Sequence, residues 1–341
     1  MVAPAGLFSN RYKVEDMPDL TGKVAVVTGG SRGIGEAIVS ALVQKNCNVH
    51  IVASTEEHAK EAISNVSEKN PNAPQLIKFH QIDLGNLKSV VSLAEKLSSE
   101  LDRLDMLYLI AGIGVAPFGL TQDGVGNHFG INHLAGMTLT DGLLDLMIKT
   151  SKEKQSGNGN GNELDKFSSR IVSESSELHR TSPSDLKCES LEEFSQDRDE
   201  TVLYGRSKCL NILYIKQLAK AHLPTLTSSS PIIPASVHPG GVATEQEAGA
   251  AQAYPILGSV LQAASKVLFM SPEQGAESAL WAGTAPAAAE RRQEVQGRYF
   301  TEADGKVDTE SDQAKQDDLA IKLWDLSVKV IQDKAGYTIK H

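Results

Sequence analysis

A glycine-rich turn between a short apolar run and an amphipathic helical pattern constrains the fold of this chain more than any other feature. Residues 23–28 predict a buried strand, and apolar residues at helical spacing follow over residues 36–44. The turn between them contains Gly29, Gly30, Gly33 and Gly35. Glycines at such a junction allow a tight turn, and the helix N-terminus then presents N–H groups to a pyrophosphate. The segment therefore predicts a nucleotide site at the first strand–helix junction.

Strand and helix patterns alternate along the rest of the chain, which predicts an α/β protein with a parallel sheet covered on both faces. Further strands are expected at 48–53, 76–82, 106–110, 169–172, 231–237 and 297–300. Further helices are expected at 54–70, 88–101, 122–149, 202–220, 256–269, 276–281 and 318–333. No repeat of solenoid length interrupts this alternation. We therefore expect a single doubly wound Rossmann-type sheet flanked by helices.

The 341 residues are expected to form one domain, residues 1–341, with a core over about 20–305. A polar, low-complexity stretch at about 151–166 predicts an inserted surface loop, because the strand–helix alternation resumes directly after it. Residues of about 245–275 are expected to form a substrate lid, and those of about 306–341 a C-terminal helical tail.

Charge and cysteine usage exclude several classes of protein. The formal net charge of −10 repels phosphate backbones, so we expect no nucleic-acid partner. Cys47, Cys188 and Cys209 lack disulfide or metal-ligand spacing, and we expect no metal site. The N-terminal residues lack the apolar core of a secretory signal, and the longest apolar stretch, 254–270, is short of the ~20 residues that a membrane span needs. We expect a cytoplasmic protein without an integral membrane segment, and the sequence leaves a homo-oligomer open.

The end of the second predicted strand bears on the choice of cofactor. A carboxylate there would bind a ribose 2′-hydroxyl, but the chain has Ser54 and Thr55 at this point and no carboxylate before Glu56. Arg32, in the glycine turn, could reach the same ribose. A cation beside two hydroxyls favours a 2′-phosphate, so we expect NADP(H) to be preferred, with NAD(H) possible. The alternative is that Arg32 is solvated and Glu56 binds NAD(H).

A tyrosine and a lysine, Tyr204 and Lys208, are spaced to project from one face of a predicted helix. A phenol is a poor proton donor and acceptor at neutral pH. A nearby ammonium stabilises the phenolate and lowers the tyrosine pKa toward a useful range. This spacing is common by chance, but here it follows the fifth predicted strand of a nucleotide-binding pattern. The pair is therefore a candidate for general acid–base chemistry.

Taken together, the motifs follow the order of a known family. In chain order they are Thr28-Gly29-x3-Gly33-x-Gly35, Asp83-Leu84, Asn132-His133, Ser175-Ser176, Tyr204-x3-Lys208 and His238-Pro239-Gly240-Gly241-Val242-x-Thr244. This ordered set resembles the short-chain dehydrogenase/reductase family, and most closely its retinol dehydrogenase-like and fungal reductase subgroup. The resemblance covers about residues 20–245 well and the C-terminal quarter loosely.

The resemblance implies four catalytic residues. Ser176 would hydrogen-bond the substrate carbonyl oxygen, and Tyr204 would exchange a proton with that oxygen. Lys208 would lower the pKa of Tyr204 and bind the nicotinamide ribose, while Asn132 would hold a water that relays protons from Lys208 to solvent. The neighbouring serines at positions 173 and 175 are alternates to Ser176.

The resemblance also implies a set of cofactor contacts. In this role, Asp83 would contact the adenine, and Val242 and Thr244 would orient the nicotinamide carboxamide. The full set is Thr28, Gly29, Ser31, Arg32, Gly33, Ile34, Gly35, Ser54, Thr55, Asp83, Leu84, Ala111, Gly112, Tyr204, Lys208, Pro239, Gly240, Val242 and Thr244.

Three positions depart from the family pattern. Ile110 stands where an asparagine would brace the strands, Glu174 stands where an apolar strand residue is expected, and Thr55 replaces an arginine that often binds the 2′-phosphate. The resemblance nonetheless implies an NADP(H)-dependent oxidoreductase that interconverts a carbonyl and an alcohol (EC 1.1.1.-). The small and aliphatic residues at 248–261 favour an apolar substrate. The resemblance to fungal reductases implies a role in fungal secondary metabolism. The alternatives are a cofactor-binding scaffold without activity and a non-redox biosynthetic enzyme that has lost hydride transfer.

Overall fold

The computed structural model describes residues 12–155, 168–223, 232–240, 270–301 and 309–341. A seven-stranded sheet, parallel throughout, forms the centre of the molecule, and its strand order is β3-β2-β1-β4-β5-β6-β7. The strands are β1 (Val24–Thr28), β2 (Asn48–Ala53), β3 (Ile77–Gln81), β4 (Met106–Leu109), β5 (Ser169–Glu174), β6 (Ile232–Val237) and β7 (Tyr299–Phe300). The predicted doubly wound parallel sheet is confirmed.

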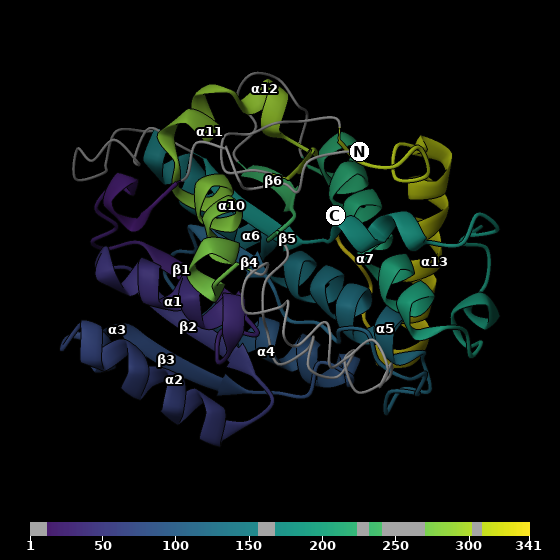
Figure 1. The fold of residues 1–341 in the computed structure, drawn as a ribbon, viewed down its shortest axis with the longest axis horizontal. Coiled ribbons are helices and arrows are strands. Elements are labelled where there is room, and N and C mark those ends of the chain that lie inside the picture. Colours follow the sequence, from purple (N-terminus) through teal and green to yellow (C-terminus); the bar gives the residue numbers. More distant parts are fainter. Residues whose placement is uncertain (1–11, 156–167, 224–231, 241–269, 302–308) are drawn as a thin grey trace.

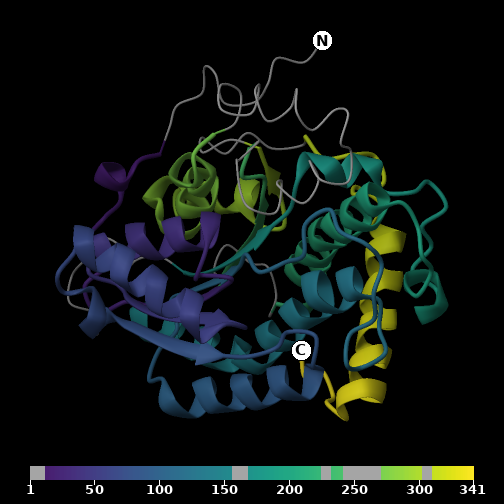
Figure 2. The ribbon, with the colours of Figure 1, turned by 60° about the horizontal axis from the view of Figure 1, so that its bottom comes forward.

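Helices cover both faces of this sheet (Figures 1 and 2). On one face, α1, α2 and α10 pack over an apolar cluster that includes Val27, Ile51 and Trp281. On the other face, α4, α6 and α7 enclose a second cluster, and α13 packs along α7. The helices are α1 (Gly33–Gln44), α2 (Glu56–Lys69), α3 (Ala73–Leu76), α4 (Leu87–Glu100), α5 (Asn127–Phe129), α6 (Ala135–Gln155), α7 (Glu200–Gln217), α10 (Pro272–Thr284), α11 (Pro286–Glu290), α12 (Arg292–Val295) and α13 (Asp317–Ala335).

The strand order determines where a ligand can bind. β1 pairs with β2 on one side and with β4 on the other, so the chain winds outward in opposite directions from these two strands. A crevice opens at such a switch point, beyond the carboxyl ends of the strands. The glycine turn follows β1 directly, so it lies at this crevice.

The two largest differences from the predicted boundaries are at the ends of the helix expected over 122–149. The helix expected over 122–149 begins only at Asn127, because residues 119–126 close a turn in which Thr121 and Val125 are hydrogen-bonded and Leu120 bridges Gly126. A π-helical segment, Gly130–Leu134, then leads into α6. α6 continues to Gln155, so the first residues of the predicted insertion are helical.

Several predictions concern residues outside the described ranges. These are the rest of the insertion, the helix expected over 256–269 and most of the predicted lid. The C-terminal tail contains α13 as expected, one residue longer at its start and two at its end than the predicted 318–333. No helix within the described ranges combines the length and the apolar composition that a membrane span needs.

Candidate active site

The glycine turn and the start of α1 are in close contact. Gly29 has a φ of +69°, a conformation that glycine adopts without strain. A Cβ added at Gly35 would lie 2.1 Å from the carbonyl oxygen of Gly29, so only glycine allows the helix to approach the turn this closely. Gly33 and Gly35 therefore let the backbone in the first turn of α1 approach a ligand closely. This arrangement fits a pyrophosphate.

Changing Gly35 to alanine tests this close approach. The added methyl group would push the turn away from α1, so we expect NADPH affinity to fall at least about tenfold and the free energy of unfolding to drop by about 2 kcal/mol. Fluorescence titration and urea unfolding measure the two effects. The matched control is Gly136→Ala, whose Cβ would meet Leu109 at an ordinary 3.5 Å. Equal behaviour of the two variants would contradict the packing argument.

A cleft of about 1100 Å³ extends from the glycine turn along the carboxyl ends of the strands. This volume is slightly above the range of about 300–1,000 Å³ that is usual for small-molecule and cofactor sites. Most of the predicted cofactor contacts line it, namely Gly29, Ser31, Arg32, Gly33, Ile34, Gly35, Ser54, Thr55, Asp83, Leu84, Ala111, Gly112, Tyr204, Pro239 and Gly240. Residues that follow β1 and β4 thus meet residues of β2, β5 and α7 in one cavity. Val242 and Thr244 lie outside the described residues.

The end of the cleft beside β2 carries the residues predicted to select the cofactor. Arg32 is exposed and contacts the ring Nε2 of His58. Glu56, the alternative ribose ligand, instead forms an ion pair with Lys60 at 2.8 Å and does not line the cleft. The adjacent Glu57 does line it. The geometry therefore brings Arg32 and His58 together at this end.

Asp83 lies deeper in the cleft and is held in place by its neighbours. Its carboxylate accepts hydrogen bonds from the backbone N–H of Gly85 at 2.8 Å and from Gln122 Nε2 at 3.1 Å. These contacts fix the side chain before any ligand binds.

Thr28 is not among the predicted contacts that line the described cleft. Its side chain is buried. Thr28 Oγ1 donates to the carbonyl oxygen of Tyr108 at 3.3 Å and accepts from the backbone N–H groups of Ile110 at 3.0 Å and Ala111 at 3.1 Å. Thr28 therefore braces β1 against the end of β4. The apolar side chain of Ile110 packs in the core, so this site is repacked without the asparagine.

Two of the four predicted catalytic residues, Ser176 and Tyr204, come from adjacent elements. Ser176 follows β5 and caps a short 3₁₀ helix, Glu177–Thr181, while Tyr204 lies in the second turn of α7. Both side chains line the cleft. The two elements approach closely at Gly205, where an added Cβ would lie 2.0 Å from Thr181 Oγ1. The glycine beside Tyr204 thus brings the tyrosine up to the serine.

The structure separates the three candidate serines. Ser176 alone among them lines the described cleft. Ser175 is fully buried and donates from Oγ to the carbonyl oxygen of Lys208 at 2.7 Å. Ser173 faces a second, smaller cavity.

Lys208 lies behind Tyr204 and is buried. Its Nζ is 5.5 Å from the centroid of the Tyr204 ring. The same Nζ donates to the Glu174 side-chain Oε1 at 3.2 Å and to the Glu174 carbonyl oxygen at 3.3 Å. Burial lowers the pKa of Lys208, but Tyr204 and Glu174 reverse this effect and the net shift is upward. Lys208 therefore stays charged beside the tyrosine.

Asn132 connects two parts of the site. Its side-chain amide accepts from the backbone N–H of Ile113 at 2.7 Å and donates to the Ile113 carbonyl oxygen at 3.0 Å. It also donates to Ser207 Oγ at 2.9 Å. Asn132 thus ties the segment after β4 to α7, the helix that carries Tyr204 and Lys208. It lies in the π-helical segment and not in the regular helix predicted for it.

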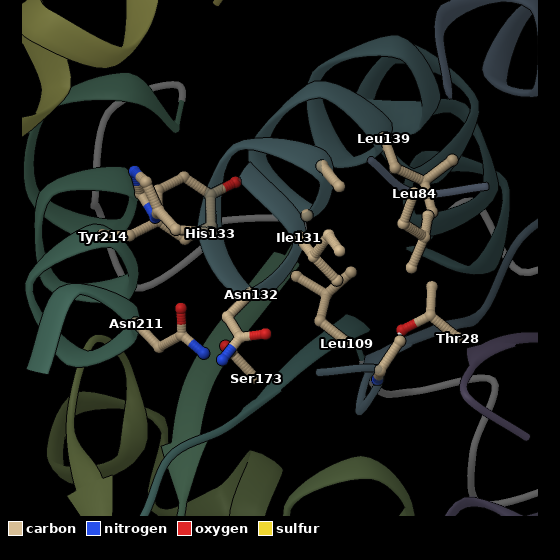
Figure 3. Close-up of a pocket in the computed structure, with 13 residues that line it drawn as sticks. Thr28, Leu84, Leu109, Ile131, Asn132, His133, Leu139, Ser173, Asn211 and Tyr214 are labelled. Carbon is tan, nitrogen blue, oxygen red and sulfur yellow. The ribbon is translucent and has the colours of Figure 1, made fainter. Parts of the chain in front are cut away.

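The second cavity lies behind Asn132 and has a volume of about 10 Å³, close to the room that one water molecule needs. Figure 3 shows Asn132, Asn211 and Ser173 gathered on one side of it, with Thr28 and Leu109 on the other. This cavity is too small for a substrate.

His58 and Glu174 are among the cleft residues that were not predicted as site residues. His58 lies one turn into α2, where no sequence pattern marks it. Glu174 was noted only as a departure, yet it lines the cleft and pairs with Lys208. The cysteines are buried and free, and no described group of His, Cys, Asp and Glu side chains could hold a metal ion.

Comparisons with known proteins agree with this geometry. A family model for short chain dehydrogenases matches residues 23–158. The chain is 31% identical to the short chain dehydrogenase/reductase dpchH of Colletotrichum higginsianum over 96% of this chain and 79% of that protein. It is also 31% identical to the chloroplastic short-chain dehydrogenase TIC 32 A of Brassica napus over 90% of this chain and 88% of that protein.

Among solved structures, the fold resembles L-sorbose reductase from Gluconobacter frateurii in complex with NADPH and L-sorbose. The TM-score is 0.59 at 19% identity, over 84% of this chain and 96% of that chain. This likeness concerns the fold.

The chain belongs to the short-chain dehydrogenase/reductase family. It is therefore an NAD(P)-dependent oxidoreductase of the class that acts on CH–OH groups, and it uses a nicotinamide dinucleotide as cofactor.

Proposed function

We propose that this chain is an NADP(H)-dependent oxidoreductase that interconverts a carbonyl and an alcohol on an apolar small molecule. The observation that carries this proposal is the placement of Ser176 and Tyr204 in the cleft that begins at the glycine turn, with the Lys208 ammonium behind the Tyr204 ring. The groups proposed for proton transfer and the glycine turn proposed for the pyrophosphate thus line one cavity.

The cleft residues fit a nicotinamide dinucleotide, which supplies the hydride chemistry when it is bound. The glycine turn and the N-terminus of α1 would bind the pyrophosphate, and Asp83 the adenine. Ser176 would hydrogen-bond the carbonyl oxygen of the substrate and hold it near Tyr204. During reduction Tyr204 would donate its phenolic proton to that oxygen, and during oxidation the phenolate would remove the proton from the alcohol. Lys208 would stabilise the phenolate electrostatically.

Contacts at the β2 end of the cleft support the preference for NADP(H). Arg32 is exposed at this end, and the hydroxyl groups of Ser54 and Thr55 lie in the same wall. Arg32 would donate to a 2′-phosphate, while Glu56 is engaged by Lys60. L-sorbose reductase, whose fold is similar, was solved in complex with NADPH.

Changing Arg32 to alanine tests this preference. Loss of a charge-assisted contact to the 2′-phosphate should weaken NADPH binding about tenfold, and NADH binding should change little. Fluorescence titration with each cofactor measures the ratio. In the alternative, Glu56 binds the ribose, so Glu56→Gln would weaken NADH binding and Arg32→Ala would have no effect on the ratio.

Apolar side chains in the cleft support an apolar substrate. Val115, Ile131 and Leu178 line it, and Leu178 is 37% exposed. The predicted lid, the cytoplasmic location and the role in fungal secondary metabolism stay predictions. Two alternatives stay open: a cofactor-binding scaffold without activity, for which Ile110 and Glu174 are the grounds, and a non-redox biosynthetic enzyme.

A further inference from the structure

Glu174 places a buried carboxylate at the end of β5. It lies two residues before Ser176, and its relative exposure is 9%. Oε1 accepts from Lys208 Nζ at 3.2 Å, while Oε2 is buried without a hydrogen-bond partner among the described residues. Burial raises the pKa of the Glu174 carboxyl, and the Lys208 ammonium offsets part of this shift. A buried carboxylate thus contacts the lysine that serves Tyr204.

The main chain of Glu174 strengthens this contact. Its carbonyl oxygen accepts from Lys208 Nζ at 3.3 Å and from Asn211 Nδ2 at 2.9 Å. The residue therefore binds the ammonium through two oxygens that are fixed to the sheet. Because Lys208 and Asn211 are both on α7, these bonds also determine how the helix sits against β5.

Few other charges face this centre from the described elements that pack around it. From the end of β6, His238 interacts with Lys208, but burial lowers the His238 pKa to about 4 and leaves it neutral at physiological pH. From the 3₁₀ helix after β5, Glu177 is paired with Arg180 at 2.9 Å, and burial lowers the pKa of His179. Among the described groups, Lys208 lies behind the Tyr204 ring and Glu174 is paired with Lys208.

We propose that Glu174 is a positioning residue of the catalytic centre, which holds the Lys208 ammonium and offsets part of its charge, and thereby extends carbonyl reduction to higher pH. An ammonium alone stabilises the phenolate of Tyr204. A carboxylate on the same ammonium opposes this effect, because it adds a negative charge to a buried cluster that must lose a proton. Tyr204 then keeps its proton to a higher pH, and the protonated phenol is the form that donates to a carbonyl oxygen.

The effect on carbonyl reduction rests on the proposed function. The effect of Glu174 on the ionisation of Tyr204 can be measured without a substrate. The chain has seven tyrosines, and the difference in ultraviolet phenolate absorbance between a protein and its Tyr204→Phe counterpart isolates the titration of Tyr204. The measurement is made in the wild-type, Glu174→Gln and Glu174→Val backgrounds. Glu174→Gln keeps the size of the side chain and an oxygen that accepts from Lys208. It therefore provides the measurement if Glu174→Val does not fold.

Removal of the carboxylate should lower the pH at which Tyr204 ionises by about one unit in both variants. Lys208 keeps the backbone carbonyl of residue 174 as an acceptor. The pH profile of alcohol oxidation should shift in the same direction. The matched control is Asp105→Asn, which removes a buried carboxylate paired with Arg103 at 2.8 Å at the opposite end of the sheet and should leave the Tyr204 titration unchanged.

A Tyr204 titration that stays in place or moves to higher pH in Glu174→Gln would overturn the inference. The result is separable from the proposed function. If no carbonyl compound is turned over but the titration shifts as expected, the proposed function fails while the electrostatic role stands. If turnover is present and the titration does not shift, the role of Glu174 fails and the proposed function stands.

Discussion

Replacing Tyr204 with phenylalanine should abolish carbonyl reduction and leave cofactor binding nearly intact. The phenolic hydroxyl is the proton donor in the proposed mechanism, and loss of a general acid costs on the order of 1,000-fold in turnover. Phenylalanine keeps the ring that packs in the cleft, so NADPH affinity should change less than about threefold. Steady-state turnover with an apolar aldehyde or ketone and fluorescence titration with NADPH measure the two quantities.

The control for this variant is Tyr214→Phe, which removes a hydroxyl from the same helix at a position that does not line the large cleft. It should keep most of the activity. Turnover within tenfold of wild type in Tyr204→Phe would contradict the proposed mechanism, because no other described phenol lines this cleft.

Replacing Lys208 with methionine should reduce both activity and stability. Without the ammonium the Tyr204 phenolate loses its stabilisation, and turnover should fall on the order of 100-fold. Lys208 is 3% exposed and its partner Glu174 is 9% exposed, so the substitution leaves a buried carboxyl group without its cation. We expect the free energy of unfolding to drop by about 3 kcal/mol, measured by urea denaturation.

A double variant, Lys208→Met with Glu174→Val, separates these two losses. An apolar pair of similar volume needs no charge partner, so most of the lost stability should return. Activity should not return, because the phenolate still lacks an ammonium. Recovery of activity in the double variant would show that Lys208 serves only the fold.

The sequence predicted most of the fold because its signals are local. Short β-branched runs and helical periodicity place every strand that the structure describes close to its expected position. The main error, the start of the helix at Asn127, arises because the turn closed by Thr121 and Val125 depends on a bridge between Leu120 and Gly126. The spacing of apolar residues along a helix does not indicate such a bridge.

The site was predictable where a residue type is required at a fixed spacing, as for the glycine turn and for Tyr204 with Lys208. Contacts between distant residues were not predictable. The Glu174 carboxylate meets Lys208 across 34 positions, and Thr28 braces Ile110 across 82. Sequence spacing could not show that the carboxylate faces the cleft, nor that Thr28 Oγ1 accepts from the backbone N–H of Ile110.

The most direct test of the central claim is a fluorescence titration of the purified protein with NADPH and, separately, with NADH. The account predicts saturable binding of both at the cleft, with NADPH bound more tightly because Arg32 meets its 2′-phosphate. Tighter binding of NADH would contradict the role of Arg32 and retain the nicotinamide site. Binding of neither would contradict the account as a whole.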